Sequence, residues 1–211
     1  VAPHFGLFSV QGPKAADALK ATNLPIPEED FAVTKTDAEI HVINNPRLGT
    51  RGFDLFVPID ALADWKGRLS DAATPCSEAA FERARILGTI PRFGVDLTKA
   101  NLPPEGGLEE RAISYAKGCY IGQEVIARIR TYGRVNRSLV GYRLDAGLDA
   151  GTQLIDDSGK TVGTLTSVVD SPRFGPIALG LAKRGSETPG QVFTGREPAQ
   201  GRATVVGIPF T

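Results

Sequence analysis

The chain has 211 residues, and its 24 Lys and Arg residues balance 24 Asp and Glu residues, so the formal net charge at pH 7 is zero. A hydrophobic fraction of 41% and a charged fraction of 23% are typical of a globular protein and argue against wholesale disorder. No apolar run approaches the roughly 20 residues of a membrane span, and we expect no secretory signal. The equal numbers of basic and acidic residues also argue against a protein whose main role is to bind nucleic acid.

Cysteine and histidine are scarce. Cys76 and Cys119 are too few for a disulfide framework in a chain of this length, and no C-x-x-C pair occurs. With only His4 and His41 beside them, neither a self-contained zinc site nor a Cys-only iron–sulfur scaffold is expected. We therefore predict no resident metal and a reducing, cytoplasmic location. Methionine is absent altogether, which fits either loss of an initiator or the later part of a longer protein.

The first part of the chain predicts a sheet covered by helices. Asp60 is the expected N-cap of a helix whose Leu62, Trp65 and Leu69 share one stripe. A further helix is expected to begin at a Ser77 cap and to end before Gly88. The remaining elements are expected as a helix over Lys14–Lys20 and strands over Phe5–Val10, Phe31–Lys35, Glu39–Ile43 and Phe53–Val57. This order predicts an α+β layer with an antiparallel sheet of the ferredoxin-like type.

The last part of the chain shows strand patterns at near-regular spacing and no helical period. Asp157–Lys160 is a hairpin turn signal, and Arg92–Arg111 is expected to be irregular. The expected strands are Leu139–Leu144, Gln153–Asp156, Thr161–Val169, Ala178–Ala182, Gln191–Thr194 and Ala203–Gly207. They predict a small all-β barrel or sandwich. We expect two domains, an α+β domain over residues 1–134 and a C-terminal β-barrel domain over residues 135–211.

The stretch from 114 to 137 carries the most chemistry. Cys119 follows Lys117 and precedes an expected helix, and a thiol at a helix N-terminus beside a cation favours the thiolate. Tyr115 and Tyr120 are placed to stack on a planar ring. The alternative is that Cys119 is a small buried residue that only packs.

Five arginines follow in a run without acids: Arg128, Arg130, Arg134, Arg137 and Arg143. They can hold an anionic ligand or a phosphate backbone, or they can form a solvated face. The arginines alone do not separate RNA from a carboxylated small molecule. No P-loop and no Ser–His–Asp set occurs. For Glu109, Glu110 and Glu124 we expect ion pairs at the protein surface.

The string K-G-C-Y-I-G-Q-E at Lys117–Glu124 resembles the signature of the YgfZ-type folate-binding proteins. These proteins are relatives of the glycine-cleavage T-protein, an aminomethyltransferase that uses tetrahydrofolate. Further stretches resemble T-protein motifs, namely Leu7–Ala15, Arg51–Pro58, Arg85–Asp96, Gly163–Ser167, Ser171–Pro172 and Pro209–Phe210. The resemblance thus covers essentially the whole chain.

The resemblance implies a partial T-protein fold, without an upstream segment of about 100 residues, the size of one domain. Leu87 stands where the family has a carboxylate that binds the pteridine. The implied folate pocket lies between the α+β part and the barrel. On this basis the expected functional residues are Cys119 and Lys117 as catalytic groups and, as tetrahydrofolate contacts, Tyr120, Tyr115, Phe81, Arg85, Arg128 and Arg130.

The implied function is that of a folate-binding accessory protein in the assembly or repair of iron–sulfur proteins, including enzymes that modify tRNA. The implied partners are a folate-type small molecule and iron–sulfur client or assembly proteins, with no membrane. The first alternative is a tetrahydrofolate-dependent aminomethyl or one-carbon transferase like the T-protein, although the expected catalytic carboxylates are absent. The second is a pure binding module whose barrel contacts RNA or a protein.

Overall fold

The computed structural model describes residues 4–133, 135–145 and 147–210. The chain forms two compact units, Val1–Ile90 and Pro91–Thr211. Each unit has its own hydrophobic core. The domain division expected after residue 134 stays a prediction, and residue 134 itself lies outside the described residues.

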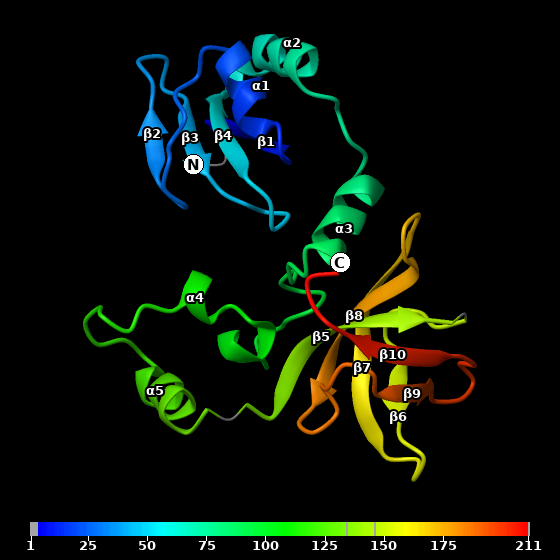
Figure 1. Ribbon diagram of the computed structural model, residues 1–211. Coiled ribbons are helices and arrows are strands. Elements are labelled where there is room, and N and C mark those ends of the chain that lie inside the picture. The colour runs from blue at the N-terminus through cyan, green and yellow to red at the C-terminus, as the bar shows by residue number, and fades with distance from the viewer. Residues whose placement is uncertain (1–3, 134, 146, 211) are drawn as a thin grey trace. The chain divides into compact units, whose positions relative to one another are not determined.

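The first unit is built on a four-stranded antiparallel sheet in the order β1-β4-β3-β2. The expected strand and helix patterns are confirmed, with ends that differ by at most two residues (Figure 1). The elements are β1 (Phe5–Gln11), α1 (Ala15–Ala21), β2 (Val33–Lys35), β3 (His41–Asn44), β4 (Gly52–Pro58), the 3-10 turn η1 (Ile59–Ala61), α2 (Leu62–Ala72) and α3 (Glu78–Leu87). The predicted α+β layer with an antiparallel sheet is therefore present.

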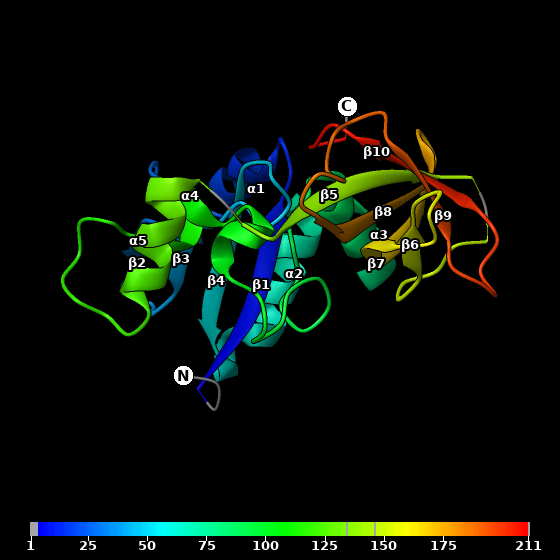
Figure 2. The same ribbon diagram turned by 90° about the horizontal axis from the view of Figure 1, so that it is seen from below.

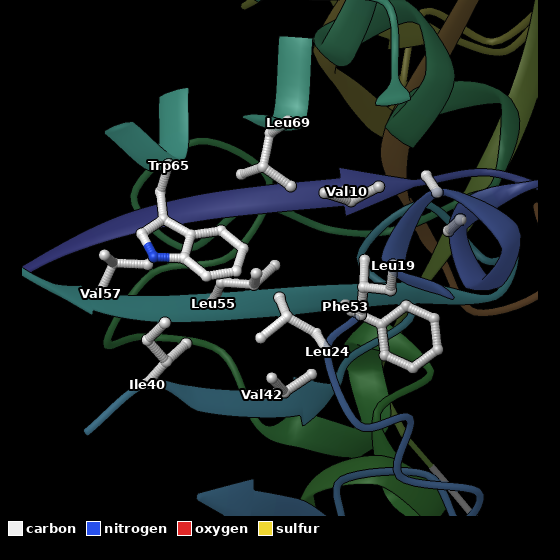
Figure 3. Packing of buried hydrophobic residues seen from close by; sticks show 12 residues of the cluster. Val10, Leu19, Leu24, Ile40, Val42, Phe53, Leu55, Val57, Trp65 and Leu69 are labelled. Atoms are coloured by element: carbon white, nitrogen blue, oxygen red, sulfur yellow. The ribbon is translucent and has the colours of Figure 1, made fainter. Parts of the chain in front are cut away.

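The core of this unit lies between the sheet and helices α1 and α2. Trp65 and Leu69 point from α2 onto the strands, as the stripe predicted (Figure 3). Leu55 and Val57 are fully buried on β4 because alternate residues of a strand face the same side. Full burial of one such aliphatic side chain contributes about 1.5–3 kcal/mol.

The start of α2 differs from the prediction. Asp60 lies inside η1, and the N-cap of α2 is Ala61, which offers no side-chain acceptor. The chain enters the helix through a continuous 3-10 turn, so no extended residue is left to act as a cap. Asp64 in the first turn of α2 provides negative charge near the positive end of the helix dipole instead.

Asp54 lies on the face of β4 opposite the core and is 1% exposed. Its carboxylate accepts hydrogen bonds from Ser9 (2.8 Å) and Asn45 (2.7 Å) and forms an ion pair with Arg47 (2.7 Å). The hydrogen bond from Arg47 to Asp54 raises the pKa of the guanidinium. This network ties the segment after β3 to the sheet, so a buried charge is fully compensated.

Helix α3 begins and ends as predicted. The Ser77 hydroxyl accepts a hydrogen bond from the Ala80 amide (3.2 Å), and Gly88 is the C-cap. Thr89 follows in a left-handed conformation with φ of +57°. A β-branched residue is rarely found there.

The second unit is a closed barrel in the strand order β10-β5-β8-β7-β6-β9 (Figures 1 and 2). All six predicted strands and the predicted barrel are confirmed. The strands are β5 (Arg137–Leu144), β6 (Gln153–Ile155), β7 (Thr161–Ser171), β8 (Gly175–Lys183), β9 (Val192–Gly195) and β10 (Arg202–Val206).

The expected irregular stretch Arg92–Arg111 contains two short helical elements, η2 (Pro103–Gly106) and α4 (Glu109–Ala112). Pro103 fits the first position of η2, where a missing amide hydrogen costs nothing. Each element has only four residues, too few to show a hydrophobic period in the sequence. Helix α5 (Gln123–Tyr132) follows and completes the unit.

Candidate functional site

The Cys119 thiol is exposed to solvent. It lies in the loop that joins α4 to α5, which forms a wide arc beside the two helices (Figures 1 and 2). Helix α5 begins at Gln123 with Gly122 as its N-cap, so a helix follows Cys119 as expected. Gly122 has a φ of +91°, a conformation that glycine adopts without steric cost. Cys119 thus precedes the first turn of α5, where a helix dipole acts most strongly.

Lys117 and Tyr120 flank Cys119 and contact each other. The Lys117 ammonium lies 4.7 Å from the centroid of the Tyr120 ring. The Tyr120 amide donates a hydrogen bond to the Gln123 side chain (3.1 Å), which joins this part of the loop to the helix. A cation over an aromatic face is a favourable arrangement. Two predicted site residues are therefore adjacent to Cys119 in a common local structure.

Tyr115, Glu109 and Arg130 form a second local cluster. The Tyr115 hydroxyl donates a short hydrogen bond to the Glu109 carboxylate, and the Arg130 guanidinium lies 4.0 Å from the Tyr115 ring centroid. The hydrogen bond to Glu109 raises the pKa of Tyr115 above its ordinary value. One aromatic ring thus connects α4 to α5, and the guanidinium is stacked on it with hydrogen-bond donors still available.

Arg128 is exposed on α5, and its guanidinium forms no hydrogen bond or ion pair with any described residue. Arg137 and Arg143 lie on β5, and Arg134 lies outside the described residues. The run of arginines is therefore divided between a helix and a barrel strand. Arg128 and Arg130 remain as the candidate cations of the Cys119 segment.

Phe81 and Arg85 belong to α3 in the first unit. Arg85 forms an ion pair with Glu82 (2.7 Å) and donates a hydrogen bond to the Ile90 carbonyl (3.0 Å). Its guanidinium therefore helps to fix the end of α3. Leu87 is the last residue of that helix.

Sequence patterns missed two members of this site. Glu109 was expected to form a surface pair, yet it accepts the Tyr115 hydroxyl. Gln123 belongs to the K-G-C-Y-I-G-Q-E string, and it supplies the acceptor for the Tyr120 amide. Tyr120 and Gln123 are three residues apart, a spacing typical of contacts at a helix start. This spacing is the sequence feature that could have predicted their hydrogen bond.

Among the described residues, no three His, Cys, Asp or Glu side chains gather closely enough to hold a metal ion. In the same part of the chain, every helix is too short or too polar to cross a membrane.

Curated proteins that resemble the chain include a transferase and an aminomethyltransferase. A protein of Arabidopsis thaliana named as a chloroplastic transferase is 35% identical over 156 residues, 73% of this chain and 36% of the relative. An aminomethyltransferase of Staphylococcus haemolyticus is 28% identical over 193 residues, 87% of this chain and 53% of the relative. No protein-family model matches the chain.

A solved structure shares the fold. The crystal structure of glycine cleavage system aminomethyltransferase T from Bartonella henselae superposes with a TM-score of 0.84 at 22% identity. The match covers 97% of this chain and 59% of that one, so the chain spans only part of the length of each relative. The chain is therefore similar in sequence to these two curated proteins, and it shares the architecture of sheet and barrel with the solved aminomethyltransferase structure.

Proposed function

We propose that this chain is a folate-binding accessory protein that acts on iron–sulfur proteins through the thiol of Cys119. The observation that carries the proposal is an exposed thiol within the K-G-C-Y-I-G-Q-E segment, with Lys117 stacked on Tyr120 beside it. A cysteine that contacts another protein or its cluster must be reachable from solvent. Since two cysteines cannot hold a cluster alone, the iron–sulfur cluster is that of a client protein.

Tetrahydrofolate combines an anionic glutamate tail with an aminopyrimidine edge that donates hydrogen bonds. Arg128 and Arg130 fit the tail, because both are exposed cations without a carboxylate partner among the described residues. Leu87 does not fit the aminopyrimidine edge, because a leucine side chain accepts no hydrogen bond. We therefore assign the tail to the arginines of α5 and expect the ring to be held mainly by stacking on Tyr115 or Tyr120.

Bound folate would supply a one-carbon carrier. The residues of this chain would hold and orient it, and Cys119 would remain free to contact the protein client. The roles of Phe81 and Arg85 as folate contacts stay predictions, and so does a cytoplasmic location, since one relative is named as chloroplastic.

The test is complementation of a strain that lacks this protein, with iron–sulfur enzyme activity as the readout. Cys119→Ala should lose complementation, and Cys76→Ala is the matched control because Cys76 is also an exposed free cysteine. Equal thermal unfolding of the two variants excludes loss of the fold as the cause. Normal complementation by Cys119→Ala would remove the thiol from the proposal.

A second candidate is aminomethyl transfer to tetrahydrofolate, favoured by the 28% identity over 193 residues to an aminomethyltransferase. The assay is formation of methylene-tetrahydrofolate from an aminomethylated carrier protein. Turnover that requires saturating tetrahydrofolate supports this activity, and its absence from the purified chain excludes it for this chain.

A further inference from the structure

A cationic aromatic cluster lies on the barrel, in segments that the proposed function does not use. The ring centroid of Phe174 is 5.4 Å from the Cζ atom of Arg143 and 4.8 Å from the Cζ atom of Arg173. Both arginines are exposed, and neither forms an ion pair with a described residue. Two positive charges are therefore held at one ring and are not neutralised.

The backbone that carries this cluster is fixed by hydrogen bonds. Arg173 and Phe174 lie in the turn between β7 and β8, and their amides donate to the hydroxyl of the buried Ser171 (3.3 and 3.4 Å). Arg143 lies on β5 opposite Ile177 of β8, so the strand register brings it near the same turn. The backbone positions of the three residues are thus set before any ligand arrives.

The C-terminal segment adds a second ring. The Phe210 and Phe174 centroids are 6.4 Å apart with the rings tilted by 41°. Phe210 lies over Gly141 of β5, where an added Cβ would come within 2.8 Å of the Phe210 Cζ atom and 2.7 Å of Ile208. Only glycine leaves this space, so the position of Phe210 depends on that residue. Three separate parts of the chain converge on the cluster.

Stacking orients a guanidinium but leaves its hydrogen-bond donors available in the plane of the group. The distances to the shared ring put the Cζ atoms of Arg143 and Arg173 within about 10 Å of each other. A phosphate or diphosphate carries more negative charge and more terminal oxygens than a carboxylate, so it can bind two separated guanidinium groups at once more strongly. The arrangement therefore favours phosphate.

We propose that Arg143 and Arg173, held by Phe174, form a binding site for the phosphate groups of a ligand. The phosphate can belong to a small phosphorylated compound or to a single-stranded polynucleotide, since both present the same oxygens. This site is independent of Cys119 and of the proposed folate contacts on α5.

The experiment is calorimetric titration of the whole chain with pyrophosphate and, separately, with a single-stranded oligonucleotide at low salt. At least one probe should bind saturably, and Arg143→Gln and Arg173→Gln should each weaken binding about tenfold through loss of one charged donor group. Arg137→Gln is the matched control, because Arg137 is also exposed on β5 but lies about 20 Å along the strand from Arg143. Its affinity should stay within twofold of the parent chain.

Phe174→Leu tests the stacked geometry separately from charge, because both arginines remain. It should weaken binding several-fold if the ring holds the guanidinium groups in place. Tighter binding of pyrophosphate identifies a small phosphorylated ligand, and tighter binding of the oligonucleotide identifies a polynucleotide. Saturable binding of neither probe, an equal loss in Arg137→Gln, or equally tight binding of a polyglutamate peptide would overturn the proposal. If Phe174→Leu fails to fold, the two arginine variants decide the result.

Discussion

The hydroxyl of Ser167 donates a hydrogen bond to Oδ1 of Asp96 across 2.6 Å, although 71 residues separate them in the chain. Thr166 donates to the same oxygen (2.5 Å), and the Arg92 amide donates to Oδ2 (2.8 Å). Adjacent residues of a regular strand face opposite sides, but β7 shifts its register against β8 between Leu165 and Ser167. This bulge lets both hydroxyls reach one carboxylate.

Replacement of Asp96 by Asn should destabilise the second unit. The NH2 group of asparagine cannot accept a hydrogen bond, and it would face either the two hydroxyl groups or the Arg92 amide. At least one buried donor would therefore lose its acceptor. We expect a loss of about 2 kcal/mol in the free energy of unfolding, measured with urea. Asp157→Asn on the exposed hairpin is the control and should change it by less than about 0.5 kcal/mol. Equal midpoints for both variants would contradict this role.

Thr89→Gly should stabilise the protein. Thr89 has a φ of +57°, and its hydroxyl is buried with no hydrogen-bond partner among the residues that the structure describes. Relief of the left-handed conformation is worth about 1–2 kcal/mol, part of which is offset by the greater freedom of glycine in the unfolded chain. Thr89→Ala removes the hydroxyl and the γ-methyl group but keeps the Cβ atom, and with it the left-handed strain, so it should gain less in thermal unfolding. A lower melting temperature for Thr89→Gly would show that the native contacts of Thr89 outweigh its backbone cost.

Tyr142→Phe should also stabilise the protein. Tyr142 is fully buried in the barrel core, and its hydroxyl has no hydrogen-bond partner among the described residues. The ring fits between Gly163 and Gly180, so phenylalanine fills the same space. Removal of the unpaired hydroxyl should raise the free energy of unfolding by about 1 kcal/mol at pH 7. A less stable variant would indicate that the hydroxyl has a partner, such as a buried water.

The same substitution should change the response to alkaline pH. Burial raises the pKa of Tyr142 above its ordinary value, so the folded state retains the proton that the unfolded state releases near pH 10. The parent chain should therefore lose stability as the pH rises above about 10, and Tyr142→Phe should lose less. Urea unfolding at pH 8 and pH 11 measures this difference. Identical losses in both chains would exclude Tyr142 as the source.

Glu109→Gln should lower the pKa of Tyr115. The hydrogen bond to the Glu109 carboxylate is the main reason that this pKa is raised. A neutral amide accepts more weakly and removes the negative charge, so the phenol should ionise at lower pH. Phenolate absorbance during an alkaline titration gives the value, and Tyr115→Phe identifies its contribution among the four tyrosines. An unchanged titration curve would mean that the bond is absent in solution.

The alternating patterns of the chain predicted the barrel strands well, because interior and exterior residues of a barrel alternate along each strand. They did not predict the closure of β9 on both β6 and β10, since cross-strand pairing depends on residues distant in sequence. The contact between Asp96 and Ser167 could not be predicted from the sequence for the same reason. The bulge that permits it has no distinct residue signal.

The candidate site was predictable in its residues but not in their contacts. The string around Cys119 identified Lys117 and Tyr120, and the cation–aromatic pair between them is a local contact. The stacking of Arg130 on Tyr115 joins two ends of an irregular loop. The conformation of such a loop does not follow from any periodic pattern of residues. Sequence patterns therefore identified the segment, and the structure was needed to identify the neighbours.

The most direct test of the central claim is calorimetric titration of the chain with tetrahydrofolate that carries one or three glutamates. Saturable binding is expected, tighter with three glutamates, because Arg128 and Arg130 offer positive charge to the anionic tail. Replacement of both arginines by Gln should remove that difference between the two ligands and leave the fold intact. If neither ligand produces saturable heat, or if the doubly substituted chain still binds the longer tail more tightly, the folate assignment to this segment is wrong.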